Sequence, residues 1–486
     1  MRYTKTLNGR EAKKALRRGI EQISVPVSAT IGAGGMNGIY QEHGIPTVTN
    51  DGVSIARRIV PQDAFERIGA DLIRDVCEKT NEEAGDGTTT SIVLASALIA
   101  EGDRSSISPA RLKNNLQDDL RNIKRLIEEI ALPVTEEDLY NIARVSVEDD
   151  SLARVVHEAF LAVGENGQVF ADESMDKIIE TDTTQGYFYN KGYANPYFVT
   201  DMAKKEVVLS NPAVLVTDQY YNLNGDLIYA LNAVIEAGYK SVVIIADKVE
   251  GELLSSLIAN KEKGILASVV IPKPDTPEEL EDIASLVGGI AITGSKQIKK
   301  IELEHFGTVD KVVITVDKST FISDNEPTEA HASYVETLKD DEDEKVRYAK
   351  LTSGISIIKV GARTDSERRY LKLKVDDAIC AVNSAKEEGY VPGAGYALYQ
   401  LSKFANTKVM KRAMKAPYLK ILQNAGYKAD GSMINVKNGS TLNPENSYII
   451  DPAKVTRVAL ENAVSVATTY LSISSVTAFF EEKSEK

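Results

Sequence analysis

Residues 81–97 read Asn-Glu-Glu-Ala-Gly-Asp-Gly-Thr-Thr-Thr-Ser-Ile-Val-Leu-Ala-Ser-Ala. Apolar residues recur at three-to-four spacing over residues 65–76 before this stretch and over 92–99 within and after it, which predicts two helices. The turn at residues 85–88 then lies at a helix N-terminus, where unpaired N–H groups favour an anion. Threonine hydroxyls add donors, and Asp86 offers a hard oxygen ligand for Mg²⁺. The stretch predicts a site for a phosphate and its metal, although a capped helix after a glycine turn uses the same residues.

Length, charge and cysteine content narrow the class of protein. The 486 residues include 57 basic and 71 acidic ones, and the formal net charge is −14. A chain of this length is expected to hold about two to four domains. Its acidity argues against nucleic acid and anionic membranes as partners, and the lack of a signal-peptide core or long apolar run favours the cytoplasm. Two distant cysteines and four scattered histidines argue against a disulfide, a zinc site and a His-based triad.

The pattern along the chain changes twice and then returns. Long helices are expected over residues 10–130, with a strand-and-turn insert near 36–56, and again at about 376–402 and 452–473. Between about 186 and 353, β-rich runs alternate with helical stretches, which predicts an α/β domain. These runs are 241–246 and 312–316, and the helical stretches are 225–237 and 250–263.

Three further stretches carry residues suited to chemistry. The glycine turn from Thr30 to Gly35 can bring backbone N–H groups close to a phosphate. Val375-Asp376-Asp377-Ala378 places carboxylates on an apolar helix, where one could orient a water for in-line attack, or both could simply be exposed. Asp451, before Pro452, could accept from ribose hydroxyls or could cap a helix.

Together and in this order, these stretches resemble the group I chaperonins, the GroEL family of ATP-driven protein-folding machines. The segments that carry the resemblance run through nearly the whole chain, and the Gly-Asp-Gly-Thr-Thr-Thr block is the most specific. They are 30–35, 49–56 with Thr-Asn-Asp-Gly at its start, 85–90, 375–378, 387–395 and 451–457. Group II chaperonins share the nucleotide motifs, but residues 192–198 and 451–457 are similar to group I.

The resemblance implies a multidomain α and α/β subunit with three discontinuous domains. The helical equatorial domain would comprise residues 1–132 and 390–486, and the small intermediate domain 133–185 and 354–389. The α/β apical domain would span 186–353. Hinges are then expected at Pro133, Gly186, Gly354 and Gly389.

The resemblance also assigns roles in one ATPase pocket. Asp86 would bind Mg²⁺, while Gly87, Thr88, Thr89, Thr90 and the turn Thr30-Ile31-Gly32 would hold the phosphates. Asp51 would stand near the γ-phosphate, and Asp377 would swing in to position the attacking water, so that hydrolysis waits for hinge closure. Gly395 and Asp451 would contact ribose, and Asn443 the base. The implied cofactors are ATP and Mg²⁺, with K⁺ as a further candidate.

Unfolded polypeptides are the implied substrates, and they require an exposed apolar surface. The candidates are Tyr193, Tyr197 and Phe198 in an extended stretch, Ile228 and Leu231 on one helix face, and Leu254, Leu257 and Ile258 on a second. Without the resemblance, such helical stripes are more often core. The subunits would assemble into a homo-oligomeric ring, seven being the family number.

The chain departs from the family in places. Ala33-Gly34 stands where the first phosphate turn usually reads Pro-Lys, so a cation is missing there. At the usual ring-to-ring contact, Leu419 and Lys428 replace an arginine and an acidic residue, which predicts a weakened or absent double ring. A co-chaperonin lid cannot be assumed. So compact a divergent member could be virus-encoded and act in the host cytoplasm.

Two other classes use similar phosphate sites. An ATP-dependent small-molecule kinase would need a polar acceptor pocket, whereas a non-catalytic scaffold would have lost turnover. The intact Asp51, Asp86 and Asp377 argue against the scaffold.

Overall fold

The computed structural model describes residues 2–42, 45–49, 51–164, 167–189, 191–202, 204–294, 300–322 and 354–481, with Val335, Leu338, Tyr348 and Leu351. Asn50 of the Thr-Asn-Asp-Gly motif lies outside the described residues. The chain forms two compact units. Unit 1 comprises Met1–Glu158, Ala171–Glu180 and Ile358–Lys486, and unit 2 comprises Ala159–Phe170 and Thr181–Ile357. The three-domain division expected from the sequence stays a prediction.

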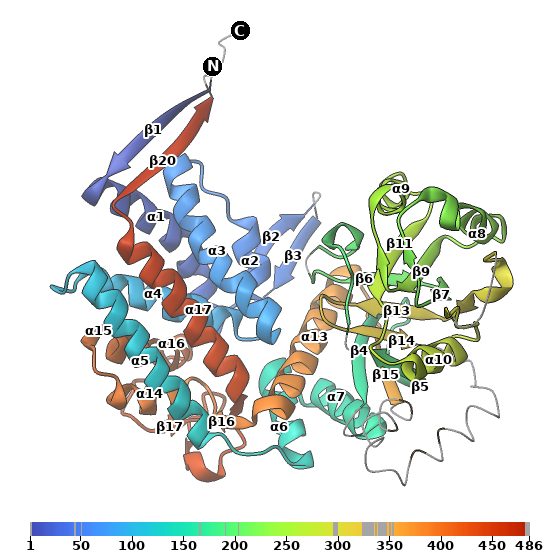
Figure 1. Ribbon diagram of the computed structural model, residues 1–486. Coiled ribbons are helices and arrows are strands. Elements are labelled where there is room, and N and C mark those ends of the chain that lie inside the picture. The colour runs from blue at the N-terminus through green and yellow to red at the C-terminus, as the bar shows by residue number, and fades with distance from the viewer. Residues whose placement is uncertain are drawn as a thin grey trace. The chain divides into compact units, whose positions relative to one another are not determined.

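Unit 1 is mainly helical (Figure 1). Its helices are α1 (Gly9–Ser28), α2 (Gly52–Arg58), α3 (Ala64–Ala84), α4 (Thr88–Asp103), α5 (Pro109–Ile130), α6 (Glu136–Val147), α13 (Asp365–Glu388), α14 (Tyr396–Leu401), α15 (Lys408–Ala413), α16 (Ala416–Asn424) and α17 (Ala453–Ser472). The helix α7 (Asp150–Val163) begins in unit 1 and ends in unit 2.

The core of unit 1 lies between α1, α3, α4, α5 and α17. The helix α17 contacts α3, α4 and α5. Glycines let α1 and α3 approach closely. A Cβ on Gly19 would lie 1.8 Å from the carbonyl oxygen of Glu66, and one on Gly69 would lie 2.0 Å from that of Leu16. Any larger residue at either position would force the two backbones apart. The close crossing of α1 and α3 therefore depends on these two glycines.

Short strands complete unit 1. The strands β1 (Arg2–Asn8) and β20 (Ser475–Glu481) pair antiparallel, and Figure 1 shows them as one two-stranded ribbon. The expected strand-and-turn insert is present as β2 (Gly38–Glu42) and β3 (Ile45–Thr49). Two more antiparallel pairs are β16 (Tyr390–Pro392) with β19 (Ile450–Pro452) and β17 (Met433–Ile434) with β18 (Thr441–Leu442).

The helix expected over about 376–402 differs from the one observed. The helix α13 begins earlier, at Asp365, where the Thr364 side chain accepts from the backbone N–H of Glu367. It ends at Glu388 because Gly389 has a φ of +78°, and a Cβ there would lie 2.4 Å from the carbonyl oxygen of Leu132. Residues 390–392 then form β16 before α14 begins. The helix expected over 452–473 is confirmed as α17.

Unit 2 has the expected α/β character. One sheet has the strand order β11-β9-β7-β12, in which the first three strands are parallel. Every residue of β9 is buried, as expected for a strand covered on both faces. The bounds are β7 (Ala213–Val216), α8 (Asn224–Glu236), β9 (Ser241–Ala246), α9 (Gly251–Glu262), β11 (Ala267–Pro272), α10 (Pro277–Leu286) and β12 (Gly307–Thr308).

A second sheet of unit 2 contains, as neighbours, β5 (Ile179–Tyr189), β14 (Ser319–Ile322), β13 (Lys311–Ile314) and β6 (Val207–Ser210). The run expected over 312–316 ends as a strand at Ile314, because the N–H of Thr315 is bonded to the carbonyl of Lys318 in a turn. The remaining strands are β4 (Gln168–Glu173), β15 (Gly354–Val360), β8 (Tyr220–Tyr221) and β10 (Lys248–Val249). None of the described helices is long and apolar enough to cross a bilayer.

Candidate functional site

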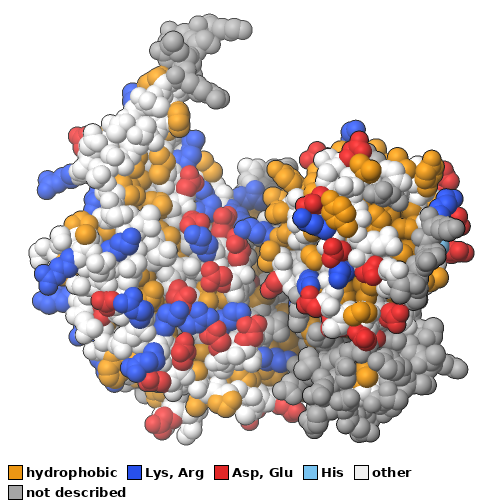
Figure 2. Space-filling model, viewed as in Figure 1, with side chains coloured by type: hydrophobic (Ala, Val, Ile, Leu, Met, Phe, Trp, Pro, Cys, Tyr) orange, Lys and Arg blue, Asp and Glu red, His pale blue; other side chains and the backbone are white. Residues whose placement is uncertain are grey.

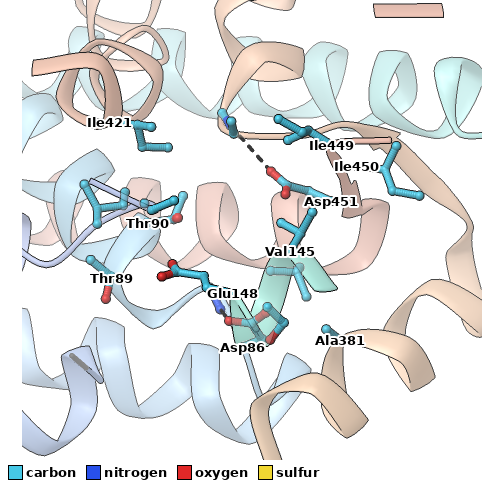
Figure 3. A pocket seen from close by; sticks show the side chains of 18 of the residues that line it. Asp86, Thr89, Thr90, Val145, Glu148, Ala381, Ile421, Ile449, Ile450 and Asp451 are labelled. Atoms are coloured by element: carbon cyan, nitrogen blue, oxygen red, sulfur yellow. Dashed lines mark hydrogen bonds between the residues drawn. The ribbon is translucent and has the colours of Figure 1, made fainter. Parts of the chain in front are cut away.

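A pocket of about 270 Å³ lies within unit 1 and is lined by segments that are far apart in the sequence (Figure 3). Of the residues proposed from the sequence for nucleotide, metal and catalysis, all but Asn443 line it. They are Thr30, Ile31, Gly32, Asp51, Asp86, Gly87, Thr88, Thr89, Thr90, Asp377, Gly395 and Asp451. The structure therefore brings these residues together around one cavity.

The N-terminus of α4 opens into this pocket without a side-chain cap. Gly85 ends α3 with a φ of +67°, and Gly87 precedes α4 with a φ of +79°. A Cβ on Gly87 would lie 2.5 Å from Cγ1 of Val455, so α17 leaves room only for glycine there. No side chain of a described residue caps the first N–H groups of α4, which leaves them available to an anion.

The turn at Thr30 to Gly32 follows α1 and faces α16. The Thr30 hydroxyl donates to the carbonyl of Val27 at 2.9 Å, so its proton is already in use. Gly32 has a φ of +78°, and a Cβ there would lie 2.8 Å from the Ile421 side chain. The N–H of Thr30 also donates to the carbonyl of Val27, at 3.0 Å. This turn can therefore offer a ligand the N–H groups of Ile31 and Gly32 and a hydroxyl acceptor rather than a hydroxyl donor.

Asp51 is held by the helix that it precedes. Its carboxylate accepts from the N–H groups of Val53 and Ser54 at 3.1 and 2.8 Å, which makes it the N-cap of α2. Its own N–H donates to the Thr49 hydroxyl. The capping function and a place in the pocket thus coexist, because a carboxylate has more acceptor sites than these two bonds use.

Asp86 and Asp377 interact electrostatically at the α13 side of the pocket. Burial raises the pKa of Asp377 well above its usual range, and the charges of Asp51 and Asp86 raise it further. Burial also raises the pKa of Asp86, although the N–H of Gly87 donates to its carboxylate and counteracts this. The charge of Lys374 lowers the pKa of both aspartates. Asp377 is thus suited to accept a proton, whereas Asp86 has a donor that favours its ionised form.

Asp451 lies in β19 beside the turn at residues 393–395. Its carboxylate accepts from the N–H of Gly395 at 3.4 Å, as drawn in Figure 3. Burial raises the pKa of Asp451 to about 6, and the charge of Asp86 contributes to the rise. Gly393 must be a glycine, since a Cβ there would lie 2.8 Å from an Asp451 carboxylate oxygen.

Asn443 is a correction. It is exposed and outside the pocket, and its side chain accepts from the N–H of Glu445 at the start of a short 3₁₀ turn. The amide that lines the pocket is Asn435, which is buried and donates to the hydroxyl of Tyr448. Asn435 directly follows β17 and Asn443 directly follows β18, so each comes after a strand of the same hairpin, and sequence spacing cannot tell which of the two faces the pocket.

Sequence reasoning missed a second group of lining residues at the end of α6. Figure 3 shows Val145 and Glu148 in the pocket with Asp86 and Thr89. Glu148 ends α6 with a φ of +60°, unusual for a residue with a side chain. The sequence did not predict a positive φ at this position, because Glu148 is not a glycine and is followed by Asp149 and Asp150. The remaining missed residues with charged or hydrogen-bonding side chains are Arg144, Ser146, Lys374, Asn435, Lys437, Tyr448 and Thr456.

The residues proposed to bind polypeptide differ in how far their side chains are exposed to solvent. Tyr197 and Ile228 are exposed, and Figure 2 shows hydrophobic side chains among charged ones on the part of unit 2 that carries α8 and α9. Tyr193, Leu254 and Ile258 are partly buried against the core. Three residues are corrected: Phe198, Leu231 and Leu257 are buried in the core of unit 2 and offer no exposed surface in this structure.

The donor set of the pocket fits a nucleotide with a hard metal ion. The open α4 N-terminus and the threonine hydroxyls match phosphate oxygens. No group of three or more potential ligand side chains among the described residues is arranged to hold a metal ion by itself. That suits Mg²⁺, which is commonly bound by one or two carboxylates together with substrate phosphates.

Comparison with known proteins identifies the fold and the family. Two crystal structures of the chaperonin gp146 from bacteriophage EL 2 (Pseudomonas aeruginosa), both obtained with ATP–BeFx, match with TM-scores of 0.70 and 0.66. Each is 22% identical and covers 98% of this chain and 99% of the phage chain, so the fold is shared along the whole length. The model of the TCP-1/cpn60 chaperonin family matches residues 23–225 and 227–478. The chain therefore belongs to the TCP-1/cpn60 chaperonin family.

Proposed function

We propose that this chain is a group I chaperonin subunit that hydrolyses ATP and uses the cycle to capture and release unfolded polypeptides. One observation carries the proposal: Asp51, Asp86, Asp377 and Asp451, from four separate segments, line one pocket beside the uncapped N-terminus of α4. Family membership already makes the chain a chaperone. The ATP–BeFx used with the phage chaperonin supports a nucleotide as the ligand here.

The phosphates would be held by the first turn of α4. Its open N–H groups and the hydroxyls of Thr88 to Thr90 are donors, and the backbone N–H groups of Ile31 and Gly32, in the turn after α1, add more. Asp86 would bind Mg²⁺, which when present neutralises phosphate charge and polarises the scissile bond. Asp451 and Gly395 would contact the ribose, and Asn435 replaces Asn443 as the candidate for the base.

Asp377 would position the attacking water and accept its proton. Burial raises its pKa, so the carboxylate is a stronger base than an exposed aspartate would be. Asp51 would orient the same water, since its two bonds to α2 hold the carboxylate in place. Because α13 carries Asp377, any movement of α13 would couple hydrolysis to conformation.

The test is ATP turnover by the purified protein with and without Mg²⁺. Wild type should hydrolyse ATP slowly with no added acceptor, and Asp377→Asn should lose about 100-fold or more in kcat while still binding nucleotide. Asp376→Asn is the matched control, because the neighbouring Asp376 forms an ion pair with Lys372 and lies outside the pocket lining. Wild-type inactivity would favour a scaffold, and turnover that requires an acceptor would favour a small-molecule kinase.

Polypeptide capture would use the exposed apolar side chains of unit 2. Tyr197 is 70% exposed and Ile228 43% exposed, and Tyr229 beside it is 72% exposed. Such side chains bind unfolded chains through burial of apolar surface, without sequence specificity. Tyr197→Ser with Ile228→Ser should abolish suppression of aggregation of a denatured test protein while leaving ATP turnover intact.

Assembly into a homo-oligomeric ring, seven subunits in the family, is part of the proposal, as is the cytoplasm as its location. Leu419 and Lys428 are both exposed and cannot form an ion pair with each other. We therefore expect a weakened or absent double ring, in the host cytoplasm if a virus encodes the chain. Mass measurement with ATP decides, because a stable stack of two rings would reject the expectation. The same measurement with a co-chaperonin would show whether a lid binds.

A further inference from the structure

Lys374 is a buried cation that lines the pocket. Its side chain is 7% exposed, and it precedes Asp377 by one turn of α13. Within the part of the chain that the structure describes, its ammonium group makes no hydrogen bond and no ion pair within 4.0 Å. Its neighbour Lys372, by contrast, pairs with Asp376 at 3.3 Å. An ion with so little exposure is costly unless something pairs with it.

The other cations lining the pocket are already engaged. Arg144 pairs with Asp150 at 2.9 Å and lies over the ring of Tyr448. Lys437 donates to the backbone carbonyl of Glu148 at 3.0 Å. The turn at Ala33-Gly34 contributes no cation, and the donors of the α4 N-terminus are neutral. Among the described lining residues, Lys374 is thus the cation with no hydrogen bond to give up when an anion enters.

The charge of Lys374 acts at one end of the pocket. Against the effect of burial, it lowers the pKa of Asp86 and of Asp377. The pKa of Asp451, which burial raises, responds to Asp86 and to the backbone of residues 394 and 395, with no contribution from Lys374. Lys374 therefore lies toward the two aspartates proposed to handle the metal and the water, and away from the proposed ribose side.

We propose that Lys374 contacts the terminal phosphate of a bound nucleoside triphosphate and so determines the preference of the site for triphosphate over diphosphate. The inference rests on the proposed function. An ammonium group close to Asp377 but not bonded to it can turn to an incoming phosphate without breaking an existing bond. A diphosphate, which lacks the terminal group, gains less from the same cation.

The experiment measures equilibrium binding of a non-hydrolysable ATP analogue and of ADP to the full-length protein, with Mg²⁺. Lys374→Met keeps the length and removes the charge, and it should weaken analogue binding by about 10- to 100-fold and ADP binding by less than about 3-fold. Lys374→Arg should retain most of the preference. Lys372→Met, on the same helix and outside the pocket lining, is the matched control and should change neither affinity.

Equal weakening of analogue and ADP, or no change in either, would overturn the inference while leaving the proposed function intact. If wild type binds no nucleotide, the proposed function fails as well, so the two failures are distinguishable. If the Lys374→Met variant does not fold, a second measurement on the wild-type protein still tests the inference. Acylation of Lys374 by an amine-reactive reagent, followed by mass spectrometry, should be slowed at least about 10-fold more by the analogue than by ADP at saturation. Equal protection by the two nucleotides would count against the contact.

Discussion

Gly52, the first residue of α2, lies against Thr89 in the first turn of α4. A Cβ on Gly52 would be 2.7 Å from the Thr89 hydroxyl and 3.2 Å from its backbone nitrogen. The starts of the two helices are therefore in contact, and only glycine leaves the hydroxyl of Thr89 in place. Asp51 and the phosphate-binding turn of α4 are held together by this contact.

Gly52→Ala should weaken ATP binding by about 10-fold, because the added methyl group displaces the Thr89 hydroxyl. The charge-assisted hydrogen bond proposed from that hydroxyl to a phosphate oxygen is then lost. Titration with a fluorescent ATP analogue measures the effect. Gly225→Ala is the control, since a Cβ at Gly225 would meet nothing within 4 Å. An unchanged affinity in Gly52→Ala would show that Thr89 does not contact the nucleotide.

Asp86→Asn should remove the dependence of ATP affinity on Mg²⁺. The amide lacks the charge of a carboxylate and is a poorer ligand for a hard cation, so the metal no longer bridges protein and phosphates. Isothermal titration with and without Mg²⁺ measures the dependence. Asp75→Asn, on the exposed side of α3 where Asp75 pairs with Lys79, should leave it unchanged. A normal Mg²⁺ response in Asp86→Asn would reassign the metal ligand.

Asp451 predicts a pH-dependent stability of the nucleotide-free protein. The pKa of this carboxyl is about 6 when folded against an ordinary value of 3.8, so the folded protein binds the proton more tightly. The stability that this group contributes is full below about pH 4 and is lost as pH rises through about 6, by at most about 3 kcal/mol. Asp451→Asn should therefore melt above wild type near pH 7, with the gap closing near pH 4. A gap that does not depend on pH would contradict the assignment.

Asp119 is a buried carboxylate in unit 1 whose hydrogen bonds are expected to contribute to the stability of the fold. Its fully buried carboxylate accepts from the N–H groups of Asn406 and Thr407 at 2.7 and 2.9 Å and from the Thr407 hydroxyl at 2.6 Å. Asp119→Asn replaces one acceptor oxygen by a donor and should lower stability by about 2–3 kcal/mol, seen as a lower melting temperature. The exposed neighbour gives the control: Asp118→Asn breaks only a surface pair with Arg121 and should cost less than about 1 kcal/mol. Equal effects would show that the buried bonds contribute little.

Local sequence predicts helix starts and glycine turns well, because these depend on neighbouring residues. Asp51, Asp86 and Asp451 follow from such turns, and the structure brings them to one pocket with Asp377. Lys374 could not be found in this way, since its burial depends on the packing of α13 against the rest of unit 1. The same limit explains Leu231 and Leu257: an apolar stripe on a helix does not say whether it faces the core or solvent.

The packing of α17 against α3, α4 and α5 has a consequence for biosynthesis. At about 5–20 residues per second, a ribosome finishes α17 tens of seconds after α5. During that interval the core that includes Ile92, Leu98 and Ile123 lacks the buried side chains that α17 contributes to it in the finished subunit. Each newly made copy therefore exposes apolar core residues for a time, as do the nascent polypeptides that a chaperone protects. High expression at elevated temperature should make the protein prone to form inclusion bodies.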